Sequence, residues 1–214
     1  MLSLFCLVLV CGGALAAPSG NQYMDNVLHT TLQNVIKSEK LDPTHLPDYT
    51  FEYTDKIFFT KVHGKAEYSE GSLSGLSQVI RISECQGPTN ISSVTVINCT
   101  LSFNMLQTSY KGRVKYGVLP KVTIDANGNT SNAIVDVSVS KALHDSKATL
   151  RSYKVRQVRR LDTHFTGLGP LNKQMKVLEE NYKGRVTQEV INVVQNRFQY
   201  ALNLAVGQVP MPLR

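Results

Sequence analysis

The apolar residues near the start of the chain recur at the spacing of a helix. From Asn21 to about Lys40 they follow one another every three or four positions, which places them on one stripe of an α-helix. They are Met24, Val27, Leu28, Leu32, Val35 and Ile36. Pro43 and Pro47 then favour an extended connector. The pattern predicts an amphipathic N-terminal helix followed by a non-helical link.

From about residue 49 to residue 158 the apolar period changes to two, the spacing of a strand with one buried face. In residues 95–105 apolar side chains alternate with polar ones, and residues 109–116 and 132–139 repeat the alternation. Glycine and proline signals such as Gly87-Pro88 and Asn127-Gly128 separate these runs. We expect an antiparallel meander of five to seven strands.

The C-terminal part returns to helical spacing. Pro170 is well placed as the first residue of a helix, and an apolar stripe extends from Leu171 to about Val206. The stripe contains Leu171, Met175, Leu178, Tyr182, Val186, Val190, Val194, Phe198 and Leu202. A helix of that length measures about 54 Å, more than the diameter of about 42 Å of a compact sphere of this chain. We therefore expect an elongated α+β fold, with a strongly curved antiparallel sheet wrapped along the long C-terminal helix. Gly184 is the expected position of any kink.

The first residues resemble a targeting segment. Residues 2–17 carry no charge, their apolar run is too short to span a bilayer, and Ala14-x-Ala16 fits a cleavage site. We interpret residues 1–16 as a secretory signal peptide and residues 17–214 as a single secreted domain. No later stretch approaches 18 apolar residues.

Cysteine usage agrees with an oxidising compartment. Cys6 and Cys11 fall in the signal, which leaves Cys85 and Cys99 as an even pair. We predict that they form a disulfide closing a turn between neighbouring strands, worth roughly 3 kcal/mol. Three sequons follow the signal, at Asn90, Asn98 and Asn129. We expect at least one glycan, best placed at the third sequon because it follows the Asn127-Gly128 turn signal.

Positive charge is concentrated in the C-terminal part. The chain has a net charge of +7, yet residues 1–140 contain ten basic and eleven acidic side chains, against thirteen and five in residues 141–214. The densest basic segment contains Arg151, Lys154, Arg156, Arg159 and Arg160. Such a surface favours an anionic membrane, lipopolysaccharide or heparin-like sugars. Solubility alone explains it equally well, and no nucleic-acid recognition motif is present.

Sequence signatures of an enzyme are missing. Gly71-Ser-Leu-Ser-Gly75 places leucine where a hydrolase elbow has its nucleophile. The five histidines show no metal-ligand spacing, and no nucleotide-binding loop occurs. We expect no enzymatic activity, no metal and no cofactor.

Several short stretches resemble the mite group 7 allergen family of the tubular lipid-binding superfamily, which includes the bactericidal/permeability-increasing proteins. The resemblance covers nearly the whole mature chain. The matching stretches are Leu41-Asp-Pro-Thr-His-Leu-Pro-Asp48, Gly75-Leu76, Thr149-Leu-Arg-Ser-Tyr-Lys-Val-Arg-Gln157, Gly167-Leu168 and the helix from Leu171. The insect takeout and juvenile-hormone-binding branch places its disulfide near the N-terminus, whereas here both cysteines lie mid-chain, which argues against a hormone carrier of that branch.

The resemblance implies an apolar groove between the sheet and the C-terminal helix that holds lipids or other long apolar ligands. The residues expected to line it are Ile97, Leu101, Phe103, Met105, Val135, Val137, Val139, Leu178, Tyr182, Val194 and Phe198. An ordinary packed core explains these positions equally well. The leading hypothesis is a secreted lipid-binding protein that recognises bacterial lipids or lipopeptides in innate immunity. The alternative is an extracellular interaction protein that binds anionic glycans or proteins through its basic surface, with no internal ligand.

Overall fold

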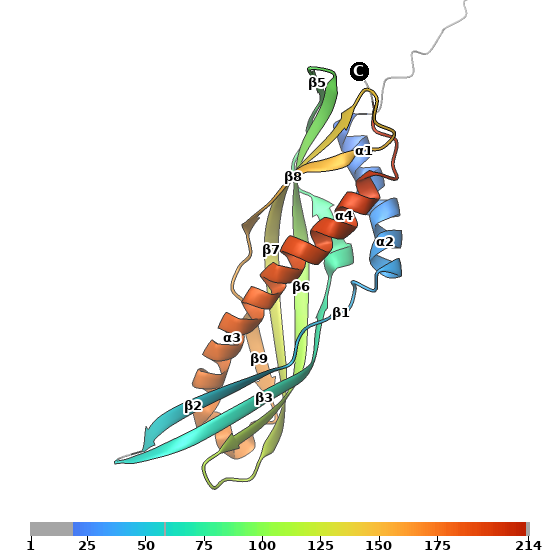
Figure 1. The fold of residues 1–214 in the computed structure, drawn as a ribbon. Helices are drawn as coiled ribbons and strands as arrows, with labels where there is room; N and C mark the ends of the chain where they lie inside the picture. The colour runs from blue at the N-terminus through green and yellow to red at the C-terminus, as the bar shows by residue number, and fades with distance from the viewer. Residues whose placement is uncertain (1–18, 58, 213–214) are drawn as a thin grey trace, which may run out of the picture.

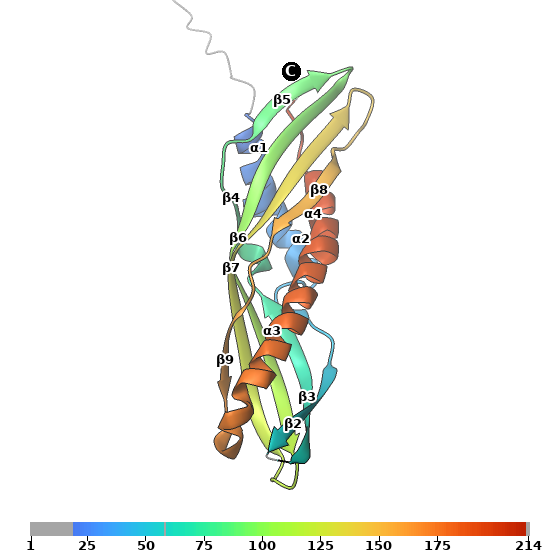
Figure 2. The same ribbon diagram turned by 90° about the vertical axis from the view of Figure 1, so that its left-hand side faces the viewer.

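The computed structural model describes residues 19–57 and 59–212, so the predicted signal peptide lies outside the described residues. The molecule is elongated, with a long antiparallel sheet and a C-terminal helix lying diagonally across one face of it (Figure 1). A quarter turn shows the shorter N-terminal helix beside the upper half of the C-terminal one (Figure 2). The predicted α+β architecture is therefore confirmed.

The N-terminal helix forms where the apolar stripe predicts it. It consists of α1 (Gly20–Asn26), the π-helical turn η1 (Val27–Thr31) and α2 (Leu32–Ser38). A capping box starts it: the Gln22 amide N–H donates to Ser19 Oγ at 3.2 Å, and Gln22 Oε1 accepts from the Ser19 amide at 3.0 Å.

Nine strands of the described chain form one antiparallel sheet. They are β1 (Thr44–His45), β2 (Tyr49–Ile57), β3 (Thr60–Ser74), β4 (Val79–Arg81), β5 (Gln86–Ile91), β6 (Val94–Tyr116), β7 (Val122–Ala142), β8 (Thr149–Gln157) and β9 (Asp162–Thr166), with the 3-10 turn η2 (Leu76–Gln78) before β4. The central order is β1-β3-β6-β7-β8, while β2 pairs with β3, β4 and β5 with β6, and β9 with β7.

The number of strands and the position of one turn differ from the prediction. Residues 95–105 and 109–116 belong to the single strand β6, and Asn127-Gly128 lies inside β7. The prediction of a turn at Asn127-Gly128 was wrong. The glycine is needed there because the Thr108 side chain of β6 packs closely against the backbone of β7. An added Cβ at Gly128 would lie 2.8 Å from Thr108 Oγ1. That hydroxyl donates to the Gly128 carbonyl at 3.2 Å. Asn129 is consequently an exposed strand residue rather than a turn tip.

A second difference concerns which side chains of β6 face the core. Inward positions are odd-numbered up to Phe103 and even-numbered from Leu106 onward. The same switch occurs in β7 around Asn132, whose φ is +56°, so the pairing of the two strands keeps its register. Met105 therefore lies on the outer face and is 42% exposed, and the prediction that it shares a face with Phe103 is wrong.

The C-terminal helical segment is as long as the apolar stripe predicts. It contains the 3-10 turn η3 (Gly169–Gln174), α3 (Met175–Asn192), the π-helical turn η4 (Val193–Phe198) and α4 (Gln199–Val206). The predicted stripe is buried from Leu178 to Leu202, whereas Met175 is 42% exposed. Helix α3 continues through Gly184 without interruption.

Gly184→Ala is expected to raise the free energy of unfolding by about 0.5–1 kcal/mol, because alanine loses less backbone entropy in a helix. An added Cβ meets nothing within 4 Å, so no steric cost opposes the gain. Chemical denaturation of both proteins measures the difference. A lower stability of the variant would contradict the uninterrupted helix.

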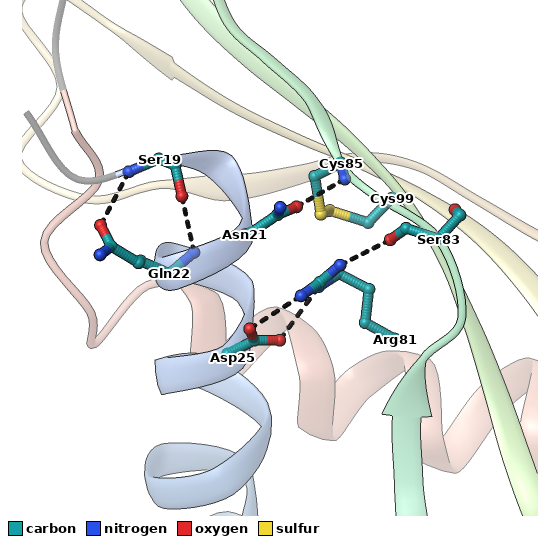
Figure 3. A network of polar contacts seen from close by, with 8 residues as sticks. All are labelled: Ser19, Asn21, Gln22, Asp25, Arg81, Ser83, Cys85 and Cys99. Carbon is teal, nitrogen blue, oxygen red and sulfur yellow. Dashed lines mark hydrogen bonds and ion pairs between the residues drawn. A yellow bond between two sulfur atoms is a disulfide. The ribbon is translucent and has the colours of Figure 1, made fainter.

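The predicted disulfide is present and lies in a polar network that attaches the N-terminal helix to the sheet (Figure 3). Cys85, just before β5, is bonded to Cys99 on β6. The Cys85 amide donates to Asn21 Oδ1 at 2.7 Å, and Arg81 makes two hydrogen bonds of 3.0 and 2.9 Å to the Asp25 carboxylate. Helix α1 is thus held to the two strands that flank the disulfide.

Candidate functional site: an aromatic face on strand β2

Ten of the eleven residues predicted to line a groove belong to one buried core layer between the sheet and the helices. All ten are at most 3% exposed. At the centre of this layer the rings of Phe103 and Phe198 pack edge to face with centroids 4.7 Å apart. Their side chains fill the layer at this point, while their role in binding a ligand stays a prediction.

The layer reaches solvent along β2. Tyr49, Phe51 and Tyr53 alternate along this strand, face the core and pack against it, yet all three are only partly buried. Strand β2 pairs with β3 alone among the described strands. The inner side of this edge strand is therefore an aromatic surface in contact with both core and water.

Rings from four elements extend this surface into a cluster. Tyr49 stacks on Tyr68 of β3 with centroids 4.7 Å apart, and the two are direct cross-strand partners. Tyr68 lies 5.7 Å from Tyr182 of α3, which in turn contacts Tyr110 of β6 at 5.9 Å. We call these four residues the tyrosine cluster. Stacked and edge-on aromatic pairs stabilise a fold beyond the burial of their area, so the cluster is expected to stabilise the packing of β2, β3, β6 and α3.

Glycine makes room for the neighbouring ring on β2. An added Cβ at Gly64 would lie 2.2 Å from the Tyr53 Cζ atom, so the phenol lies directly over the backbone of β3. The same ring stacks on Phe51 at 5.4 Å and on Tyr116 at 6.1 Å. Gly64 thereby allows an aromatic side chain to lie flat on the sheet at its edge.

The hydroxyl groups of the tyrosine cluster fall into two kinds. Tyr110 donates to the Pro47 carbonyl at 3.0 Å, and Tyr182 donates to the Ala126 carbonyl at 3.0 Å. The hydroxyls of Tyr49 and Tyr68 are buried and have no hydrogen-bond partner among the described residues, and the same holds for Tyr53 beside the cluster. A buried hydroxyl without a partner costs about 1–3 kcal/mol.

This difference leads to a stability prediction. Tyr68→Phe is expected to leave the free energy of unfolding unchanged or raise it by about 1 kcal/mol, because it removes a polar group that has no partner. Tyr110→Phe is the matched control and is expected to lower the free energy by about 1 kcal/mol, because the Pro47 carbonyl loses its donor. Equal losses in both variants, measured by denaturant titration, would contradict the distinction.

Helix α3 adds polar groups beside the cluster. Asn181, the neighbour of Tyr182, has a buried Oδ1 atom without a partner among the described residues. Arg185, one turn further along, acts electrostatically on Tyr49 and Tyr110 and pairs with Glu189 at 3.0 Å. The guanidinium is half-exposed. An ion pair of one positive and one negative charge therefore lies near the cluster.

Burial changes the titration of these phenols. Desolvation raises the pKa of Tyr53 and of Tyr182 to about 12, and it raises the pKa of Tyr49, Tyr68 and Tyr110 as well. All of them are neutral hydrogen-bond donors at physiological pH. In the unfolded chain the pKa of tyrosine is near 10.

Because the folded pKa exceeds the unfolded one, the stability contributed by these phenols is complete below about pH 10 and is lost as the pH rises through the folded pKa. The free energy of unfolding is expected to fall above about pH 10, with most phenolate absorbance appearing together with unfolding. Early titration of most phenols in a still folded protein would contradict this expectation. Circular dichroism and absorbance recorded across the same pH range provide the test.

The predicted basic residues lie on and just beyond β8 and are exposed. Arg156 pairs with Asp136 at 2.6 Å, and Arg160 pairs with Glu180 at 2.6 Å. These two acidic partners lie on β7 and α3. Arg151, Lys154 and Arg159 form no ion pair with the described residues.

Lys154 and Arg156 line a shallow hollow of about 430 Å³ on the outer face of the sheet. The hollow also contains Asn98, one of the three sequon asparagines. Asn90, Asn98 and Asn129 are all exposed and lie on β5, β6 and β7. Glycosylation of each stays a prediction.

The described residues contain no group of three or more histidine, cysteine, aspartate or glutamate side chains that could hold a metal ion. None of the helices in the described ranges is long and apolar enough to cross a membrane.

The sequence patterns predicted Tyr182 as a site residue but missed the rest of the tyrosine cluster. The alternation of Tyr49, Phe51 and Tyr53 was visible in the sequence and indicates an aromatic strand face. The pairing that brings Tyr68 and Tyr110 to this face depends on the long-range register of β2, β3 and β6.

The chain belongs to the group 7 allergen family, whose model matches residues 19–204. The salivary anticoagulant protein P23 of Ixodes scapularis is 23% identical over 198 residues, which cover 90% of this chain and 88% of that relative. The family predicted from the short sequence motifs is thus confirmed.

Two solved structures are similar in arrangement at low sequence identity. Lipopolysaccharide binding protein gives a TM-score of 0.47 at 16% identity, and the match covers 87% of this chain but only 40% of that longer protein. Takeout 1 of Epiphyas postvittana gives a TM-score of 0.43 at 16% identity, covering 87% of this chain and 92% of that one.

Proposed function

We propose that this protein is a secreted, non-enzymatic binding protein for a lipid or another long apolar ligand. The observation that carries the proposal is the partly exposed aromatic face of β2. Tyr49, Phe51 and Tyr53 connect solvent directly with the apolar layer between the sheet and α3. An apolar chain that displaces water from this face contacts the layer without crossing a polar barrier.

The ligand's apolar chain is proposed to continue from β2 toward the predicted lining residues, reaching Leu178 and Tyr182 first. Each buried methylene contributes about 0.8 kcal/mol, so ten methylenes contribute roughly 8 kcal/mol before the costs of binding. That is enough for micromolar affinity at best. Selectivity for chain length is low, because apolar walls discriminate weakly between similar chains.

Bacterial lipids or lipopeptides are the ligands that we propose within this class. Their anionic groups suit a chain whose residues 141–214 contain thirteen basic and five acidic side chains. Recognition of such amphiphiles outside the cell fits a role in innate defence.

Binding of an anionic glycan at the outer face is the second candidate function. The exposed side chains of Arg151, Lys154 and Arg159, which form no ion pair with the described residues, support it. In that case binding would be sensitive to salt and would need no internal ligand.

A fluorescent fatty-acid probe separates the two candidates. The delipidated protein is expected to bind the probe in the micromolar range and to release it when several unrelated lipids are added. A triple variant serves as the control and is expected to leave probe binding unchanged. It combines Arg151→Gln, Lys154→Gln and Arg159→Gln. No binding of any probe by the folded protein, together with salt-sensitive heparin binding that this triple variant loses, would favour the second candidate.

A further inference from the structure

We infer that the tyrosine cluster contains a head-group site for a carboxylate, with the hydroxyls of Tyr49 and Tyr68 as its hydrogen-bond donors. The inference rests on the proposed function and specifies the polar end of the ligand. It would make the protein selective for apolar carboxylic acids over neutral lipids of the same chain length.

The two hydroxyls are held in fixed positions. Tyr49 and Tyr68 are direct partners across β2 and β3, and their rings stack at 4.7 Å with planes 17° apart. The Tyr110 ring packs edge to face against Tyr49 with centroids 5.7 Å apart. The Tyr182 ring packs at a tilt against Tyr68, also with centroids 5.7 Å apart. A pair of donors held by its own packing needs little reordering when a ligand binds.

Within the tyrosine cluster these two hydroxyls lack partners among the described residues, as does the Tyr53 hydroxyl beside it, while those of Tyr110 and Tyr182 have partners. Tyr110 and Tyr182 donate to backbone carbonyls, whereas the hydroxyl oxygens of Tyr49 and Tyr68 are buried without a partner in the described part of the chain. Tyr68 is only 1% exposed. Buried polar groups in folded proteins are generally paired, so two adjacent exceptions indicate a position that something else satisfies.

Two neighbouring donors without partners suit a ligand group that offers two acceptor oxygens. The nearby charges on α3 are those of the ion pair of Arg185 and Glu189. Glu189 acts on Tyr110, and the Asp48 carboxylate also acts on Tyr110. A carboxylate offers two acceptor oxygens to two neutral donors, and hydrogen bonds to a charged acceptor are stronger than neutral ones.

The aromatic surroundings suit the remainder of such a ligand. Phe51 and the ring of Tyr53 continue the apolar face along β2 from Tyr49, and both remain partly exposed. A carboxylic acid with a long apolar chain can therefore bind its head at Tyr49 and Tyr68 while its chain lies against the aromatic face and the layer below α3.

The test compares hexadecanoic acid, its methyl ester and hexadecanol as competitors of a fluorescent lipid probe on the delipidated full chain. Wild-type protein is expected to bind the acid at least about tenfold more tightly than the ester or the alcohol. The double variant that combines Tyr49→Phe and Tyr68→Phe is expected to lose most of this preference for the acid. The same variant is expected to bind the ester still. Tyr23→Phe is the matched control, because its hydroxyl donates to the Val206 carbonyl at the other end of the molecule.

Each outcome has a distinct meaning. Binding of all three compounds by wild type with equal affinity, or an undiminished preference for the acid in the double variant, would overturn the head-group site and leave lipid binding intact. Failure of all three compounds to bind wild type would instead overturn the proposed function itself. Loss of the preference in the Tyr23→Phe control would show that the effect does not come from the tyrosine cluster.

Discussion

Phe198→Ala is expected to lower the free energy of unfolding by about 3–5 kcal/mol, the usual cost of removing a fully buried phenylalanine ring. Phe198 is 0% exposed and lies at the end of η4, where its ring contacts Phe103 at 4.7 Å and Tyr153 at 6.5 Å. The loss combines the transfer energy of the ring with the cavity that it leaves in the layer. Denaturant unfolding monitored by circular dichroism measures it.

Tyr200→Ala is the control on the same helical segment, because this side chain is 56% exposed. It is expected to change stability by less than about 0.5 kcal/mol. If Phe198→Ala cost less than about 1 kcal/mol, the centre of the layer would not be packed as described. A lipid that restored the stability of this variant would show that the cavity accepts an apolar chain.

Asp42→Ala is expected to lower the free energy of unfolding by about 2–3 kcal/mol, because hydrogen bonds to charged groups are stronger than neutral ones. The Asp42 carboxylate accepts from the Gly75 amide at 2.8 Å, from the Ser77 amide at 2.7 Å, and from the Ser77 hydroxyl. Two of the sequence stretches that identify the family, residues 41–48 and 75–76, are therefore in direct contact. Thermal or denaturant unfolding of the variant gives the size of the effect.

Asp48→Ala provides the comparison, since this aspartate ends the same stretch but is exposed. A change of less than about 0.5 kcal/mol is expected there. Asp42→Asn should fall between the two, because an amide keeps one acceptor oxygen and loses the charge. Equal stabilities of the Asp42→Ala and Asp48→Ala variants would show that the link to η2 contributes nothing.

The helices could be predicted because their signals are local. The stripe from Leu178 to Leu202 and the stripe from Met24 to Ile36 both depend only on the helical period, and both are buried as predicted. The pairing of Cys85 with Cys99 was predictable as well, because only two cysteines follow residue 16.

The antiparallel sheet itself was predictable, but the lengths of its strands and the side chains that face inward were not. Strands β6 and β7 switch their inward face together near Met105 and Asn132, and neither strand's sequence shows that its partner compensates. Gly128 has the local signal of a turn but lies opposite Thr108 in the middle of the sheet. The alternation of apolar and polar residues along one strand does not show where the inward-facing side of that strand changes, because the change depends on both paired strands.

The candidate site required long-range information. Tyr49 and Tyr68 are adjacent because β2 and β3 pair in one register, and Tyr182 reaches them from α3. The lack of partners at two hydroxyls is a property of the assembled cluster, since Tyr110 has the same side chain and a partner. The sequence alone could therefore indicate an apolar layer but not its polar end.

Native mass spectrometry of the delipidated protein mixed with hexadecanoic acid tests the central claim most directly. We predict a 1:1 complex that forms in the micromolar range and is absent from a control sample denatured before mixing. A folded protein that gave no complex with this acid, its methyl ester or any other long-chain lipid would contradict the account.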